Sequence, residues 1–415
     1  MIRYCFAILF LFTQSYSQQL VVLEHADEIE GREEKNFRIR ELKGNVSLLQ
    51  SDLKIKCDRA IQNLTTNEID LFGNVKILRS NLIINTKQAR YNANKKVSYF
   101  NHGIELFRGK FFVESNFGIY LVEDGVTEFK GNVKSRDSVS VINCENLKYF
   151  EKEEKAIATE NVLVRNNENS LKIISGRMEH FENKNYSKFT LSPLFMQVDT
   201  LENGKIDTLV VEGKILEVYN DKSQTMIANG NVKLAKGDLS AICEDLKFEQ
   251  NEGRITFLQN PVLWFNNSQI TGDTIISKLE DKKIKELEVK RKAFMLTQND
   301  TIADNKYDQM SGKKIIMNFE SNDLKKISII GNATSLYFLY DDEKPKGVNK
   351  TSGDKIDLYF SDGLLETISI KKGAEGNYYP EKMVKRNLQE INLEGFKILK
   401  DKPTINKIIG GKFAN

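Results

Sequence analysis

The chain has 415 residues and a nearly balanced charge, with 61 lysines and arginines against 58 aspartates and glutamates. This balance argues against nucleic acid as the main partner, because such binding needs a concentrated basic surface. Only 5 prolines are present, and no Pro/Gly/Ser-rich linker interrupts the sequence. A chain of this length without a linker favours one repetitive architecture over several separate domains.

The N-terminus has the pattern of a secretory signal peptide. Met1 and Arg3 precede an uninterrupted apolar run over residues 6–12, and the small residues Ser15 and Ser17 fit a signal-peptidase site. The apolar run is shorter than the ~20 residues that a membrane-spanning helix needs. We therefore predict a signal peptide over residues 1–17, cleaved near Ser17, and a mature protein outside the cytoplasm.

A Gly-Asn-Val triplet recurs along the chain, starting at Gly44, Gly73, Gly131 and Gly230. With weaker copies at 102 and 160, the first five starts (44, 73, 102, 131 and 160) are each 29 residues apart. A fixed spacing of this length indicates an array of similar supersecondary units. Further weak copies, the first of them degenerate, begin at Ser192, Asn260, Arg291 and Gly331.

Each unit contains a strand-like alternation after the triplet. Leu53, Ile55 and Cys57 follow Gly44 at offsets nine, eleven and thirteen, which indicates a strand with one buried face. At offsets sixteen and eighteen after Gly73 the apolar pattern continues in the opposite phase, which predicts a β-bulge or a corner. Because glycine and asparagine tolerate left-handed backbone angles, we place a turn or bulge at the Gly-Asn pair, where it opens the other strand of the unit.

These patterns predict an all-β fold. A unit of 29 residues holds two strands and two turns, with one strand assigned to each of two facing sheets. Stacked units would form an elongated repeat β-jellyroll or sandwich of antiparallel strands, with a parallel β-helix as the alternative. We divide the chain into repeats over 18–260, further repeats with longer connections over 261–380, and a tail over 381–415. A short helix is predicted from Glu381 to Glu390.

The repeat resembles that of a known family. Leu42-Lys43-Gly44-Asn45-Val46, followed by a strand ending in Cys57-Asp58, is similar to the OstA-type repeat of the OstA/LptA lipopolysaccharide-transport family. Cys144-Glu145 and Cys243-Glu244 stand at the same place in later units, where the family often has Ala-Asp. The similarity extends over most of the chain after the signal peptide.

The resemblance implies a non-enzymatic periplasmic bridge protein without cofactors. Such a protein would hold the acyl chains of lipopolysaccharide in a hydrophobic groove between two β-sheets and carry the lipid toward the outer membrane. Its other partners would be OstA-like domains of the transport bridge at the inner and outer membranes, joined by stacking of edge strands. Self-association stays open, and nucleic acid is not expected.

Two aliphatic sheet faces that do not close fully would form a slot for lipid, because each buried methylene contributes about 0.8 kcal/mol. Trp264 is interpreted as an inward residue beside Val262 that could line the groove, although ordinary core packing is the favoured explanation. The same alternative applies to every inward position. The positions predicted to line the groove are Val46, Leu48, Leu53, Ile55, Val75, Ile77, Leu82, Ile84, Ile104, Leu106, Val133, Ile142, Val162, Val164, Val232, Leu234 and Trp264.

Two other functions remain open at this point. A carbohydrate-active enzyme on a β-solenoid would need Asp, Arg or His side chains clustered at one repeat offset, and an adhesive or structural repeat protein would have a closed, Thr/Asn-rich core. Neither pattern stands out in the sequence, so no catalytic residue is predicted.

Metal binding is not expected either, because no histidine has a cysteine or histidine at ligand spacing. The cysteines at offset thirteen are interpreted as small core residues, and the acidic residues that follow them as outward-facing. The residues weighed in this way are His25, His102, His180, Cys57, Cys144, Cys243, Asp58, Glu145 and Glu244.

Overall fold

The computed structural model describes residues 20–34, 37–200, 204–280, 283–298, 306–320, 323–341, 344–361 and 363–410. The predicted signal peptide lies outside the described residues. Two compact units, Met1–Ser138 (unit 1) and Val139–Asn415 (unit 2), divide the chain. The divisions predicted at 260 and 380 from the repeat pattern stay predictions. Within the described ranges, no helix is both long and apolar enough to cross a membrane.

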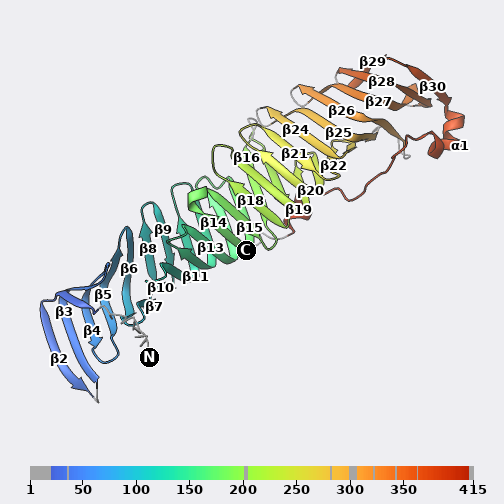
Figure 1. Cartoon of the computed structure of the whole chain (residues 1–415). Coiled ribbons are helices and arrows are strands. Elements are labelled where there is room, and N and C mark those ends of the chain that lie inside the picture. Colours follow the sequence, from blue (N-terminus) through green and yellow to red (C-terminus); the bar gives the residue numbers. More distant parts are fainter. Residues whose placement is uncertain are drawn as a thin grey trace, which may run out of the picture. The chain divides into compact units, whose positions relative to one another are not determined.

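Unit 1 is made of strands in chain order (Figure 1). Their bounds are β1 (Val22–His25), β2 (Glu28–Glu34), β3 (Phe37–Gln50), β4 (Leu53–Asn63), β5 (Glu68–Arg79), β6 (Leu82–Asn92), β7 (Val97–Phe100), β8 (Ile104–Arg108), β9 (Phe111–Ser115), β10 (Phe117–Leu121) and β11 (Val126–Arg136).

Unit 2 continues with strands and ends in two short helices. Its first strands are β12 (Ser140–Phe150), β13 (Lys155–Asn166), β14 (Leu171–Phe181), β15 (Tyr186–Thr190), β16 (Leu194–Thr200), β17 (Ile206–Glu212), β18 (Ile215–Tyr219), β19 (Thr225–Lys236), β20 (Leu239–Glu249) and β21 (Arg254–Leu258), with the 3-10 turn η1 (Glu182–Lys184). The rest are β22 (Val262–Phe265), β23 (Ser268–Thr271), β24 (Thr274–Glu280), β25 (Lys283–Gln298), β26 (Tyr307–Glu320), β27 (Asp323–Asp341), β28 (Lys344–Ser361), β29 (Leu364–Lys371), β30 (Glu375–Pro380), α1 (Glu381–Ile391) and α2 (Ile405–Ile409).

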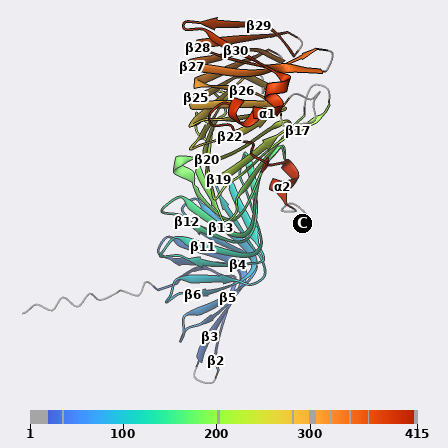
Figure 2. The same ribbon diagram turned by 90° about the vertical axis from the view of Figure 1, so that its right-hand side faces the viewer.

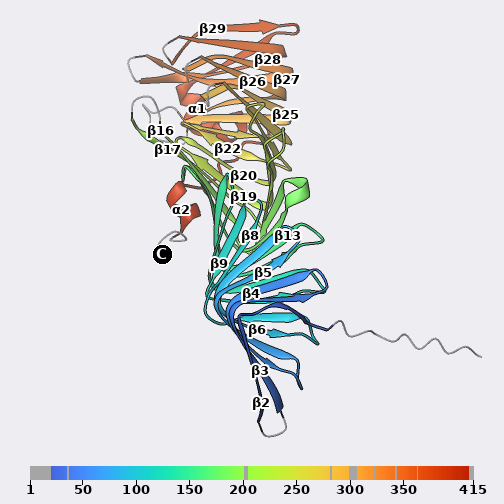
Figure 3. The same cartoon turned by 90° about the vertical axis from the view of Figure 1, so that its left-hand side faces the viewer.

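The long strands that contain a Gly-Asn pair, such as β3 and β5, pass through a β-bulge there. In β3 and β4, Leu42 pairs with Ala60 and Val46 pairs with Cys57, so Gly44 and Asn45 oppose the single residue Asp58. Gly44 and Asn45 both have left-handed backbone angles, with φ of 73° and 47°. Such a two-against-one bulge bends the strand, and Figure 3 shows β3 to β6 as curved ribbons.

The two halves of these bent strands form two layers. Layer A is the ladder on the Val46 side of the bulges, and layer B is the ladder on the Leu42 side. In unit 1, layer A contains residues 22–25, 46–57, 75–86, 104–115 and 133–136, while layer B contains 28–34, 37–43, 60–72, 89–100 and 118–130. The bulges form the corner that joins the layers. The hairpin turns of both layers lie on the opposite side, which we call the mouth.

The all-β repeat jellyroll is confirmed, with one correction to its construction. Neighbouring strands pair antiparallel within each unit, so the parallel β-helix is wrong. The assignment of one strand to each sheet is also wrong. Consecutive strands are hydrogen-bonded to each other, and each long strand gives one half to each layer, because the Gly-Asn bulge lies inside the strand and does not open it.

At the first two bulges, an acidic side chain packs against the glycine and binds the asparagine. Asp58 accepts a hydrogen bond of 2.9 Å from Asn74 in the next bulge, and Asp27 accepts one of 3.0 Å from Asn45. A Cβ on Gly73 would lie 2.3 Å from Oδ2 of Asp58, where no side chain fits. The Gly-Asn pair and the acidic residue therefore form one unit that joins successive rungs at the corner.

Degenerate copies of the repeat keep the same backbone. Pairs of left-handed residues recur at the corner even where the Gly-Asn pair is missing, which confirms the weak copies near 160, 192 and 291 and adds one near 372 that the sequence did not suggest. The pairs are Glu160-Asn161, Leu191-Ser192, Gln259-Asn260, Arg291-Lys292 and Lys372-Gly373.

The C-terminal tail packs on the outer face of layer A in unit 2. Helix α1 confirms the short helix predicted from Glu381 to Glu390. Val384 and Ile391, one helical face, lie against Phe294 and Phe338. The segment after α1 runs back along unit 2 (Figure 1), and both helices lie on one side of it in Figure 2. The C-terminal strands are also long, since β27 has 19 residues and β28 has 18.

Candidate functional site

The interior between the layers of unit 1 is lined by buried aliphatic side chains. From layer A, Val46 and Ile77 point inward and are 1% and 0% exposed. From layer B, Leu42 and Leu71 meet them and are both 0% exposed. The inner faces are packed against each other, so a lipid chain between them would have to separate the layers.

All the predicted lining positions except Trp264 lie on the inner face of layer A. Most of them are fully buried. Ile142 is 9% exposed and Val164 is only partly buried. Both residues lie near the start of unit 2 and are the least buried of the predicted inward positions on layer A.

The predicted list omitted the opposite wall. Every residue in it belongs to layer A or its extension, whereas the inner face of layer B carries equally buried residues. The opposite-phase apolar positions at offsets sixteen and eighteen were the signal that could have found them. The omitted wall residues of unit 1 include Ala60, Ile69, Leu71, Ala89, Tyr91, Phe100, Tyr120 and Phe129.

The inward position predicted for Trp264 is wrong, because the residue lies on the outer face of layer A. It pairs with Ser240, whereas the inward Ala241 pairs with Leu263. The bulge lies at Gln259-Asn260, one residue earlier than the sequence pattern suggested, so the phase of the following strand is inverted. Trp264 is 7% exposed because the C-terminal tail covers this face, where the tail also binds the neighbouring Gln269.

The mouth of unit 1 is closed by a set of polar side chains that we call the clasp. Gln50 of layer A donates a hydrogen bond of 3.1 Å to the carbonyl of Ala93 in layer B, and the hydroxyl of Tyr91 donates to Gln50. One rung further, Arg79 of layer A donates to the hydroxyl of Tyr120, at 3.3 Å, and to a backbone carbonyl of layer B. The clasp therefore joins the two layers across the side where they are not covalently continuous.

Arg79 is held strongly in its charged form. Burial alone would lower the pKa of Arg79, but hydrogen bonds with Tyr120 and Asp52 raise it above its usual value. The same contact, at 2.8 Å, lowers the pKa of Asp52. Hydrogen bonds to a charged group are the stronger ones, so Arg79 is the main contact of the clasp.

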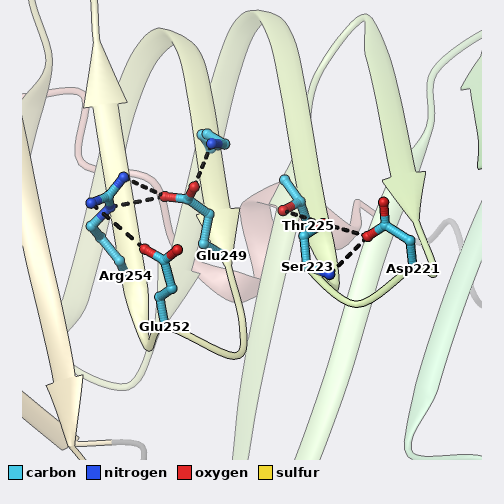
Figure 4. A network of polar contacts seen from close by, with 7 residues as sticks. Asp221, Ser223, Thr225, Glu249, Glu252 and Arg254 are labelled. Atoms are coloured by element: carbon cyan, nitrogen blue, oxygen red, sulfur yellow. Dashed lines mark hydrogen bonds and ion pairs between the residues drawn. The ribbon is translucent and has the colours of Figure 1, made fainter.

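Polar groups at the layer B turns of unit 2 have a different arrangement (Figure 4). Glu249 accepts hydrogen bonds from Lys247 and, at 2.8 Å, from Arg254, while Asp221 accepts from Ser223. The pictured contacts join strands and turns of one layer, not the two layers to each other. They stiffen the rim of layer B.

Two family models match this chain. The model described as OstA-like protein matches residues 18–174, and the model described as LptA/(LptD N-terminal domain) LPS transport protein matches residues 112–283. The chain belongs to the OstA/LptA-like family. No curated protein matches the chain.

A solved structure resembles part of this OstA-like chain. It is LptH, described as the LptA-homologous periplasmic component of the lipopolysaccharide transport device from Pseudomonas aeruginosa. The identity is 12%, the match covers 34% of this chain and 95% of LptH, and the TM-score is 0.27.

The cysteines of the OstA-like repeat are buried. Cys57, Cys144 and Cys243 lie on the inner face and are free thiols. Burial raises the pKa of Cys57 to about 11 and those of Cys144 and Cys243 to about 12. Since the thiolate is the reactive form, these side chains are inert core residues at neutral pH.

The histidines and repeat carboxylates are dispersed. His25 contacts Asp27 at 3.1 Å, His180 contacts Ser187 at 3.0 Å, and His102 is exposed at a corner. Among the described residues, no three or more His, Cys, Asp or Glu side chains are grouped to hold a metal ion.

Proposed function

We propose that this chain is a non-enzymatic periplasmic bridge protein that binds lipopolysaccharide and carries it toward the outer membrane. The acyl chains would lie between layers A and B. The observation that carries this proposal is the continuous aliphatic interior of an OstA-like repeat, with buried inner walls in both layers. Burying acyl methylenes there would contribute about 0.8 kcal/mol each.

Entry of the lipid requires the layers to separate at the mouth. In unit 1 only side-chain contacts cross the clasp at Gln50 and Arg79, whereas the corner is held by the backbone itself. Opening by hinge motion at the corner would expose the inner walls while keeping both ladders intact. The saccharide headgroup would remain outside the mouth, in water.

The open edges of the fold suit the proposed stacking with other OstA-like domains. The edge strands of unit 1 include the exposed Val22 and Ile29, and those of unit 2 include the exposed Leu364 and Ile368. Unpaired edge strands accept a further strand from another chain. Self-association through these edges is part of the same proposal.

Photo-crosslinking from two neighbouring residues would test the lipid position. A photoreactive amino acid replaces Ile84, which is 0% exposed on the inner face, or Ile83, which is 36% exposed on the outer face. We expect lipopolysaccharide to crosslink to position 84 and not to position 83, and a neutral polysaccharide to crosslink to neither. Equal crosslinking at both positions, or none at 84 in a folded protein, would contradict the proposal.

A further inference from the structure

The corner of unit 1 is interrupted between β7 and β8, and again at Asn116 between β9 and β10. Strand β7 ends at Phe100 and β8 starts at Ile104, so the strand breaks at the weak repeat copy His102-Gly103. Strand β6 pairs with β8 up to Asn85 and with β7 only from Arg90, which leaves residues 86–89 outside both ladders. At this place the gap in β4 is one residue, Asp58, toward β3 and two residues, Cys57 and Asp58, toward β5.

The interruption produces a groove of about 910 Å³ on the outside of layer A at the corner, which we call the corner groove. Amide side chains of Asn74, Asn85, Asn116 and Asn132 line it, together with hydroxyl groups and three lysines. It is separate from the lipid interior, because inward residues such as Val75 form its floor and the layer lies between.

Side chains of like charge face each other on neighbouring strands along the groove. Lys56 stands directly opposite Lys76 on the neighbouring strand, and Glu105 stands directly opposite Glu114. Like charges in such positions are destabilising. No described residue forms an ion pair with Lys56, Lys76 or Lys87, all of which are exposed.

An aromatic ring stands beside the amide groups. Phe117 is 49% exposed and directly follows Asn116 of the groove wall. The position of a Cβ on Gly131 is 3.4 Å from Asn116 and 3.6 Å from Phe117, so the ring and the amide lie together at the corner. An exposed ring next to polar groups offers a flat apolar surface for a sugar face, and the amides and hydroxyls match sugar hydroxyls.

We propose that the corner groove binds an acidic oligosaccharide. Its carboxylate or phosphate groups would lie between Lys56, Lys76 and Lys87 and relieve the repulsion of the lysine pair. Sugar hydroxyls would be held by the asparagine amides, and one ring would rest on Phe117. The proposal does not depend on lipid in the interior, because the groove opens on the other side of layer A.

Calorimetric titration of the purified chain would test the site. The probes are a carboxylated oligosaccharide such as tetragalacturonate, its neutral methyl ester, and a lipid-free phosphorylated oligosaccharide. We expect binding of one or both acidic probes, weakened by salt, and at least tenfold weaker binding of the ester. The two acidic arms distinguish a carboxylate-bearing glycan from a phosphorylated saccharide as the source of the ligand.

The variant K56A/K76A should lose at least tenfold in affinity for the bound acidic probe, while K95A/K110A, which removes two exposed lysines at hairpin turns, should bind as the wild type does. K56A/K76A should also unfold at an equal or higher temperature than the wild type, because it removes a like-charge pair. Equal affinity for acidic and neutral probes, binding by neither acidic probe, or unchanged binding by K56A/K76A would overturn the proposal. Failure here would leave the crosslinking at Ile84 unaffected.

Discussion

Units 1 and 2 share one jellyroll plan, but the contacts that stabilise each unit internally lie in different places. In unit 1, the clasp at Gln50 and Arg79 ties layer A to layer B across the mouth. In unit 2, the C-terminal tail binds the outer face of layer A, through Val384 of α1 and Ile408 of α2. The clasp must break when the layers separate. The C-terminal tail on the outer face, which we call the strap, can stay in place. The two units should therefore respond differently to the same perturbation.

The largest effect is expected from breaking the strap. Val384 is 1% exposed against Phe294 and Phe338, so V384D buries an unpaired carboxylate there. We expect a loss of about 3–5 kcal/mol in the free energy of unfolding of unit 2. Trp264, the single tryptophan, lies under the same tail and reports the transition by fluorescence during urea unfolding.

The neighbouring residue supplies the control for the strap. Met383 is 49% exposed on the other face of α1, so M383D should change the unfolding free energy by less than about 0.5 kcal/mol. If V384D and M383D both have the unfolding free energy of the wild type, the tail is not part of the folded core of unit 2.

The pH dependence of stability should also differ between the units. Burial raises the pKa of Asp308 in unit 2 from 3.8 to about 7, and the N–H of Phe338 partly offsets this. The folded state then binds more protons than the unfolded state between these values, so stability falls as pH rises from about 4 to about 7 and levels off above it. D308N should flatten that part of the pH profile of the Trp264 transition. A profile with the same slope in D308N would assign the dependence to other groups.

Breaking the clasp should have a smaller effect on stability and a specific effect on lipid. R79A removes the charged donor to Tyr120 and to layer B, which should cost about 1.5–3 kcal/mol. Faster uptake of lipopolysaccharide should accompany this loss, together with faster amide exchange around Tyr120. R90A removes an exposed ion pair with Asp70 within one layer and should leave the uptake rate unchanged. Slower uptake in R79A would show that the clasp does not restrain entry.

Local sequence patterns predicted the repeat well, but they did not predict how its strands are distributed over the two layers. The spacing of the triplets and the alternation at Leu53, Ile55 and Cys57 gave the all-β class, the place of the bulges and, apart from Trp264, the inward positions on layer A. They did not show that a strand crosses from one layer to the other, because the change of phase after the triplet marks a bulge or corner without saying which sheet the strand enters next. Trp264 was misplaced for a related reason, since a bulge shifted by one residue inverts every later side chain of its strand.

The sequence did not predict the clasp or the corner groove, for another reason. Gln50 and Ala93 are 43 residues apart and meet only because two hairpin turns of different layers face each other. The groove arises where His102 replaces the usual glycine and the rung splits. A weak repeat copy was visible in the sequence, but its weakness did not say whether the corner would close or open.

The smallest effect is a gain in stability at a degenerate corner of unit 2. Arg291 and Lys292 hold the left-handed angles that Gly and Asn hold elsewhere, with φ of 58° and 48°. Their side chains are 80% and 86% exposed and approach Asp273 only at 3.9 Å, so their ion pairs contribute little.

R291G/K292N should therefore raise the free energy of unfolding by about 1 kcal/mol, measured by urea unfolding with Trp264 fluorescence. R291A/K292A removes the same charges but keeps a Cβ at both positions, and it should leave the stability unchanged. An equal gain in both variants would mean that charge, and not backbone strain, limits this corner. A gain only with Gly-Asn would show that the backbone of the bulge itself selects the motif repeated along the chain.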